Sequence, residues 1–195
     1  MVTRPDFTAE AVTAARSVIV ELFHLLGEYR DDIVVIGGWV PALLMSVDDD
    51  PHVGSLDVDL ALDHQKLAES GYQSIASLLR SAGYESDTAQ PFRFWRTLSN
   101  AARPIRIVVD LLAGQYGGTG SSRRTQKVQD VLPRKARGCD LAFDSPVEMD
   151  MQCELPDGGL DCVSIRVAGI VPFLVMKAMA LADRLKEKDA YDIYY

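Results

Sequence analysis

The sequence predicts an α+β fold in which helices flank a mixed sheet. Both helical and strand-like apolar patterns occur, and no βαβ unit repeats along the chain, so a doubly wound parallel sheet is not expected. The chain has 195 residues, of which 48% are hydrophobic and 25% are charged. A globular chain of this size can bury one proper core. We therefore expect a single principal domain.

Helices are predicted where apolar residues recur at helical spacing and capping residues flank the run. Thr8 can cap the first helix and Gly27 lies near its end, while Gly83 ends the second. Pro41 suits the first turn of a short helix after the first strand. The longer predicted helices cover residues 8–28, 64–82, 170–185 and 188–195.

Strands are predicted from short runs of β-branched and aromatic residues bounded by turn residues. Residues 46–52 are expected to form an acidic loop, and residues 114–138 a Gly- and Ser-rich loop with many cations. Trp39 and Trp95 are expected in the core or in a pocket wall rather than as stacking platforms. The predicted strands cover residues 33–36, 56–62, 90–98 and 104–112, with 147–155 and 162–167 forming a hairpin.

The domain boundary is predicted just after the second strand of this hairpin. Residues 1–168 are expected to form the core domain, including its N-terminal helix. Residues 169–195 are expected to begin a C-terminal helical region that continues past Tyr195, because the last helical pattern stops without a cap.

Bulk composition limits the class of protein. The net charge of −8 argues against general electrostatic binding to nucleic acid or to a membrane surface, although a local basic patch can still exist. No apolar run reaches the roughly 18 residues of a spanning helix, and residues 1–10 lack the apolar core of a signal peptide. The three cysteines lack metal-ligand spacing and suggest reduced thiols. We expect a cytoplasmic protein without a membrane partner.

Three aspartates interrupt predicted strands and are the leading candidates for chemistry. Asp57 and Asp59 share one strand face, while Val58 between them points the other way. Asp110 lies in another apolar strand, where a carboxylate is costly to bury unless it is paired or bound to a metal. If the two strands are neighbours, the carboxylates form a hard-oxygen site of the kind that Mg²⁺ prefers. The alternative is that they simply face solvent.

Small residues beside these carboxylates are candidates for phosphate contacts. Gly37 and Gly38 follow the first strand and permit a phosphate to approach backbone N–H groups closely. Ser55 offers a hydroxyl and an N–H just before the Asp57 strand. A tight turn is the alternative explanation for the two glycines.

Several cations are candidates for contacts with anionic substrates. Lys177 and Arg184 are seven residues apart and share one helix face, from which both can reach a triphosphate. Residues 117–137 contain six cations against the single Asp130, and this segment could contact RNA. A solvated polar helix face explains Lys177 and Arg184 equally well, and a charged loop such as 117–137 is more often solvated than bound to RNA. The strands near the carboxylates carry further cations that could balance the acidic site or hold an acceptor's phosphate: Arg93, Arg96 and Arg106.

Taken together, these motifs resemble the DNA polymerase β-type nucleotidyltransferase superfamily. The resemblance rests on Gly37-Gly38 before an apolar helix, Gly-Ser-Leu-Asp-Val-Asp-Leu at 54–60, and Ile-Arg-Ile-Val-Val-Asp-Leu-Leu at 105–112. Lys177 with Asp183-Arg184, followed by Lys-Glu-Lys-Asp-Ala-Tyr-Asp at 186–192, is similar to the AbiEii-type nucleotidyltransferase toxins, relatives of the MenT toxins. The similarity covers roughly residues 33–195, although the spacing from Gly38 to Asp57 is longer than in the compact motif.

The resemblance implies a polymerase β-like fold and a set of residue roles. Asp57 and Asp59 would hold Mg²⁺, and Asp110 would be the third catalytic carboxylate and metal ligand. The nucleotide would be bound by Gly37, Gly38, Ser55, Lys177, Arg184 and Asp189.

The expected activity is transfer of NMP from an NTP to an acceptor hydroxyl, with pyrophosphate leaving in line. The resemblance implies tRNA or another RNA as acceptor, although a protein side chain or a small molecule is also open. It further implies a role as the toxin of a bacterial toxin–antitoxin or phage-defence system, and an antitoxin protein as a candidate partner. One alternative is a small-molecule nucleotidyltransferase of the aminoglycoside type. Another is a nucleotide- or partner-binding module of the same fold that has lost turnover.

Overall fold

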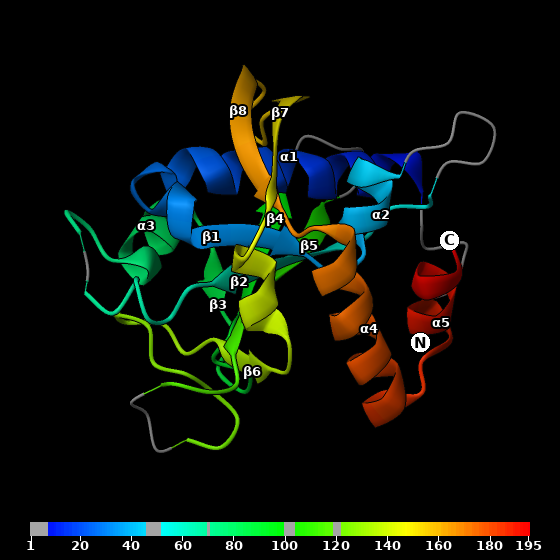
Figure 1. The fold of residues 1–195 in the computed structure, drawn as a ribbon. Coiled ribbons are helices and arrows are strands. Elements are labelled where there is room, and N and C mark those ends of the chain that lie inside the picture. Colours follow the sequence, from blue (N-terminus) through cyan, green and yellow to red (C-terminus); the bar gives the residue numbers. More distant parts are fainter. Residues whose placement is uncertain (1–7, 46–51, 70, 100–103, 119–121) are drawn as a thin grey trace.

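The α+β architecture predicted from the sequence is confirmed in a computed structural model that describes residues 8–45, 52–69, 71–99, 104–118 and 122–195 (Figure 1). The helices are α1 (Ala9–Leu25), α2 (Trp39–Leu44), α3 (Ile75–Ser81), α4 (Ile170–Arg184) and α5 (Glu187–Tyr194), with the 3-10 helices η2 (Gly27–Asp32) and η3 (Cys139–Phe143). The strands are β1 (Ile33–Ile36), β2 (Asp57–Leu62), β3 (Glu85–Ser86), β4 (Arg93–Leu98), β5 (Ile105–Gly114), β6 (Arg134–Ala136), β7 (Val147–Glu154) and β8 (Leu160–Val167).

The described strands form one mixed sheet. Its order is β3-β4-β5-β2-β1-β8-β7, and β6 pairs with β5 beside this path. β2 is parallel to β5 and antiparallel to β1, whereas β1 is parallel to β8. β4 and β5 are antiparallel, as are β7 and β8, which form the predicted hairpin. This mixture of directions matches the expected absence of a repeated βαβ unit.

Helix α1 covers one face of the sheet and contributes eight buried residues. Thr8 caps it as predicted, because its hydroxyl accepts a hydrogen bond from the N–H of Ala11 at 3.2 Å. The helix packs against β2, β5, β7 and β8. Ile19 and Leu22 are fully buried there, and each stabilises the fold by about 1.5–3 kcal/mol through apolar burial.

Helices α4 and α5 follow the last strand and lie side by side in Figure 1. Helix α4 packs against η3 and α2. The predicted helices over 170–185 and 188–195 are thereby confirmed to within a residue or so at each end.

The helix predicted over 64–82 is wrong in its first half, because the observed helix spans only Ile75–Ser81. Ser74 is its N-cap. Just before it, the N–H of Gly71 donates a hydrogen bond to the hydroxyl of Tyr29 at 2.7 Å. A distant side chain thus satisfies backbone groups that a longer helix would have paired locally.

The segment 114–138, predicted as a loop, contains the short strand β6. Its Arg134 pairs with Leu112 near the end of β5, beyond Asp110, the last β5 residue in the register with β4. The acidic loop predicted over 46–52 lies outside the described residues except for His52.

Candidate functional site

The three predicted carboxylates lie on neighbouring strands, as the sequence analysis anticipated. In the parallel pairing of β2 and β5, Asp59 is opposite Asp110, and Asp57 is opposite Val108. Residues directly opposite or two apart share a face of the sheet. All three carboxylates therefore lie on one face.

The turn after β1 lies against Asp59 and requires glycine. Gly37 has a φ of 76°, in the left-handed region that other residues rarely adopt. A Cβ atom on Gly37 would clash with the Asp59 carboxylate and lie 3.1 Å from its Cγ. The glycine predicted from the motif is thus the residue that allows the Asp59 carboxylate to lie over the turn.

Gly38, Ser55 and Lys188 meet at a second point beside this turn. A Cβ atom on Gly38 would be 3.2 Å from both the Ser55 hydroxyl oxygen and the Lys188 Nζ. Three groups therefore surround one small space: the Gly38 backbone, the Ser55 hydroxyl and the Lys188 ammonium group. Sequence reasoning had not chosen Lys188 as a site residue, although it belongs to the 186–192 run that carried the resemblance.

The carboxylates repel one another electrostatically. Burial, followed by the charges of Asp110 and Asp57, raises the pKa of Asp59 from 3.8 to about 6. Burial and Asp110 also raise the pKa of Asp57. Lys177 and Arg134 act in the opposite direction on the pKa of Asp59 without cancelling the effect. The site therefore has an excess of negative potential that a cation would offset.

We expect Asp59→Asn to raise the free energy of unfolding at pH 7. The pKa of Asp59 is higher in the folded protein than the ordinary value of 3.8, so its ionised form costs stability. That cost is absent below about pH 4, grows as the pH rises, and is complete above about pH 6. The expected gain at pH 7 is on the order of 1–3 kcal/mol.

Urea unfolding of the wild type and Asp59→Asn at pH 7 and at pH 4 measures this effect. Asp150→Asn, at an exposed position of β7, is the matched control and should change little at either pH. Asp59→Asn destabilising the protein at pH 7, or stabilising it equally at both pH values, would contradict the prediction.

Both oxygens of Asp110 bond to Arg93, its register partner on β4. Arg93 Nε donates to Oδ1 at 2.7 Å and Nη2 donates to Oδ2 at 2.8 Å. The prediction that Arg93 balances the acidic site is therefore confirmed. It is wrong for Arg96, which points to the other face and bonds to Glu21 of α1. Arg106 lies near the start of β5, opposite Thr97, and pairs with Glu85 at 3.7 Å.

The carboxylate oxygens of Asp57 and Asp59 are hard ligands of the kind that Mg²⁺ prefers. Burial raises the pKa values of both groups most, and the neighbouring carboxylates add to the rise through negative charge that would attract a cation. Within the described ranges, no group of three or more His, Cys, Asp or Glu side chains is arranged to hold a metal ion. Because Arg93 occupies both oxygens of Asp110, the assignment of Asp110 as a third ligand stays a prediction.

A second cluster of charges joins α4 and α5. Lys177 Nζ lies 3.2 Å from Asp189 Oδ1 and 2.6 Å from Asp192 Oδ2. Arg184 donates two hydrogen bonds to Asp189, both at 2.7 Å. The predicted site residues Lys177, Arg184 and Asp189 are thus brought together, but they pair with one another in this cluster.

Asp192 anchors this cluster to the core through His52. The N–H of Gly54 donates to His52 Nδ1 at 3.1 Å, so the neutral ring carries its proton on Nε2 and donates it to Asp192 Oδ1 at 3.1 Å. Burial favours the protonated form of Asp192, but His52, Lys177 and Lys188 outweigh it and hold its pKa well below the usual range. Sequence reasoning missed Asp192. The available signal was its position one helical turn after Asp189.

The two clusters are within electrostatic range of each other. Lys177 lowers the pKa of Asp59, and Lys186 and Lys188 lower the pKa of Asp57. The hydrogen bonds to Asp189 raise the pKa of Arg184 most, and the charge of Asp59 adds to the rise. Helices α4 and α5 therefore present cations toward the carboxylates of the sheet.

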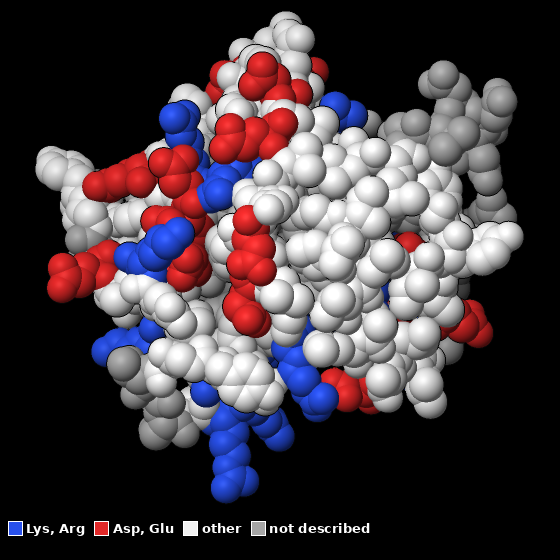
Figure 2. Space-filling view, in the orientation of Figure 1, with Lys and Arg blue, Asp and Glu red and all other residues white. Residues whose placement is uncertain are grey.

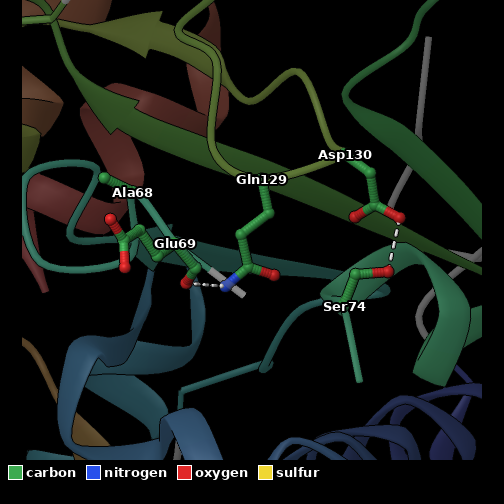
Figure 3. A pocket seen from close by; sticks show the side chains of 5 residues that line it. All are labelled: Ala68, Glu69, Ser74, Gln129 and Asp130. Atoms are coloured by element: carbon green, nitrogen blue, oxygen red, sulfur yellow. Dashed lines mark hydrogen bonds between the residues drawn. The ribbon is translucent and has the colours of Figure 1, made fainter. Parts of the chain in front are cut away.

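A surface pocket of about 580 Å³ lies elsewhere, and none of its lining residues belongs to either cluster (Figure 3). Its polar groups bond to one another. Gln129 donates to the Glu69 carbonyl at 2.9 Å, and Ser74 donates to Asp130. Asp130 also accepts from the N–H of Ala76 at 3.1 Å, so these contacts hold the start of α3. We assign no function to this pocket.

No protein-family model matches the chain, and no curated protein matches it. Among the helices of the described ranges, none combines the length and the apolar character that crossing a membrane requires.

Proposed function

We propose that the protein is a Mg²⁺-dependent nucleotidyltransferase that transfers NMP from an NTP to an acceptor hydroxyl of tRNA or another RNA. The observation that carries the proposal is the placement of Asp57, Asp59 and Asp110 on one sheet face beside the glycine turn at Gly37. A polymerase β-like fold, a cytoplasmic location and a role as the toxin of a toxin–antitoxin or phage-defence pair belong to the same proposal.

In this proposal the triphosphate lies where Gly38, Ser55 and Lys188 meet. The Ser55 hydroxyl can donate a hydrogen bond to a phosphate oxygen, and the Lys188 ammonium supplies positive charge. Lys188 already lies 3.0 Å from Asp192 Oδ1. That contact fixes the position of the ammonium group before a nucleotide arrives.

The chemistry is an in-line displacement at the α-phosphorus. The acceptor oxygen forms a bond to this atom while the bond to the bridging oxygen of pyrophosphate breaks. Mg²⁺, bound by Asp57 and Asp59, would supply the charge that activates the hydroxyl and stabilises the leaving group. Asp110 would take the hydroxyl proton. For this, one of its oxygens has to leave Arg93.

A binding module without turnover is the second candidate, and one observation favours it. Arg93 bonds to both oxygens of Asp110, so this carboxylate already has a partner and neither oxygen is available to take a proton from an acceptor. In such a module the same turn and carboxylates would bind Mg²⁺ and nucleotide, and no label would be transferred.

We expect Asp57→Ala and Asp59→Ala to reduce transfer by about 100-fold or more while leaving the fold intact, because each removes a group that positions charge at the reaction centre. The assay incubates purified protein with each α-labelled NTP, Mg²⁺ and total bacterial RNA or tRNA. Asp150→Asn is the control and should keep full activity. Circular dichroism checks the fold of each variant.

The destination of the label separates the proposals. Label in RNA supports the leading one. Label only in protein identifies a protein acceptor, and no label with retained NTP binding indicates the binding module. Full activity of either aspartate variant would contradict the metal-site assignment.

A further inference from the structure

The face of the sheet that carries the carboxylates continues across β4. The antiparallel register places Trp95 opposite Val108, and Val108 is in turn opposite Asp57 on β2. These side chains form one row across three strands. Trp95 is therefore two strands from Asp57, roughly 10 Å across the sheet.

Arginine side chains lie over the aromatic rings of this face. The guanidinium carbon of Arg106 lies 4.0 Å from the centroid of the Trp95 ring. That of Arg134 of β6 lies 5.4 Å from the centroid of the Phe92 ring, just before β4. The guanidinium carbon of Arg93 is near both rings, 6.0 Å from the centroid of Phe92 and 5.8 Å from that of Trp95. We call Phe92, Trp95, Arg106 and Arg134 the aromatic–arginine face.

Core packing does not account for this face. Along β4, Phe94 and Leu98 point to the other side and are almost fully buried, with exposed fractions of 2% and 8%. Phe92 and Trp95 are only half-buried, and the Arg106 side chain is 52% exposed. The Arg106 guanidinium, which also lies 3.7 Å from the exposed Glu85, and the uncovered part of Trp95 are therefore accessible to a ligand.

A basic segment borders this face. Residues 122–137 contain six cations, Arg123, Arg124, Lys127, Arg134, Lys135 and Arg137, against the single Asp130, in a chain whose net charge is −8. Strand β6 belongs to this segment and brings Arg134 to the Phe92 ring. Figure 2 shows Lys and Arg side chains gathered at the lower edge of the molecule, below the position of β6 in Figure 1.

We propose that the aromatic–arginine face binds the unpaired bases of a single-stranded nucleic acid whose backbone follows the basic segment 122–137 and whose end reaches Asp57 and Asp59. Unpaired bases stack on aromatic rings and on guanidinium planes, so both members of the Trp95–Arg106 pair can take a base. Lys and Arg along the segment offset the phosphate charge, which the three aspartates alone would repel. The inference rests on the proposed function for the role of the bound end.

The test measures binding without catalysis. A labelled unstructured RNA of roughly ten nucleotides is titrated with the full chain, without NTP or Mg²⁺, and its fluorescence anisotropy is recorded. Trp95→Leu is expected to weaken binding at least about fivefold, as loss of one stacked base does. Trp95→Phe should retain most of the affinity, which separates loss of stacking from loss of folding.

Lys127→Gln, an exposed cation of the basic segment, tests the phosphate contribution through salt dependence. If Lys127 contacts one phosphate, the slope of log affinity against log salt should become shallower by roughly 0.7. The controls are Tyr72→Leu and Arg80→Gln, an exposed aromatic residue and an exposed cation outside the proposed surface. Both should bind as the wild type does.

Tryptophan emission gives an independent readout. The chain has two tryptophans, and Trp39 is only 3% exposed, so RNA binding should quench mainly Trp95. Unchanged affinity in Trp95→Leu, or duplex RNA bound as tightly as the single strand, would overturn the proposal.

The RNA-binding result and the NTP-transfer result can fail independently of each other. If RNA binding depends on Trp95 but no NTP transfer occurs in the wild type, the proposed function fails and the binding face stands. If label enters RNA equally well in the wild type and in Trp95→Leu, the function stands and the aromatic–arginine face is wrong.

Discussion

Asp192→Ala is expected to lower the free energy of unfolding by about 3–5 kcal/mol, because it leaves buried charges without a partner. Asp192 is 2% exposed and accepts from His52 while pairing with Lys177 and Lys188. Removing one member of such a buried network leaves its partners desolvated and unpaired, so the loss of stability is larger than the net contribution of the intact network. Urea or thermal unfolding at pH 7 measures the loss.

The pH dependence provides a second check. The pKa of Asp192 is depressed in the folded protein, so its contribution is fully present above the ordinary pKa of 3.8 and is lost as the pH falls. The destabilisation caused by Asp192→Ala should therefore be largest at neutral pH and shrink in acid. Asp183→Ala is the control, since Asp183 is an exposed partner of Arg137 at 3.7 Å, and it should cost about 0–1 kcal/mol. Equal losses in both variants would contradict the buried network.

Gly37→Ala is expected to destabilise the protein by about 2–5 kcal/mol through two combined effects. An alanine at this position would have to adopt a φ of 76°, and its Cβ atom would clash with the Asp59 carboxylate. The carboxylate must then move, so NTP transfer should fall together with stability. Chemical denaturation and the transfer assay measure the two losses.

A double-mutant cycle separates the two effects. In an Asp59→Ala background the clash with the carboxylate is removed and only the Cβ atom of residue 59, 3.2 Å away, remains close. Gly37→Ala should then cost mainly the backbone strain of about 1–2 kcal/mol. Gly27→Ala is the matched control, because a Cβ atom there meets nothing within 4 Å. It should change stability by less than about 1 kcal/mol. An additive cycle would show that Gly37 is not required to accommodate Asp59.

Asp59 is placed where it costs stability. Burial and two neighbouring carboxylates raise its pKa to about 6, and the Gly37 turn that admits it has a positive φ. Sites that store such unfavourable interactions are often functional, because a ligand that relieves them binds more tightly. This pattern is what makes the carboxylate face a stronger candidate than the surface pocket of Figure 3, whose polar groups bond to one another.

Local patterns in the sequence were enough to predict most elements. The periodicity and the Thr8 cap located α1, and the turn residues 156–159 located the β7–β8 hairpin. The prediction over 64–82 failed where Tyr29, 42 residues away from Gly71, bonds to the backbone. Apolar periodicity contains no information about such a distant partner.

The site was predictable to a similar extent. Asp57 and Asp59 share a face because side chains alternate along any strand. That Asp110 lies beside Asp59 depended on two strands being neighbours, which the parallel pairing of β2 and β5 confirms. The bidentate partner of Asp110 was among several arginines near the site, and only the β4–β5 register selects Arg93.

The sequence by itself determined the α+β class, the positions of most helices and strands, and the common face of Asp57 and Asp59. These features follow from backbone geometry and side-chain periodicity, which act over a few residues. Only the tertiary structure decided that α5 docks against the segment before β2 through Asp192 and His52, which are 140 residues apart. Buried charges need partners, and packing of distant segments chooses those partners.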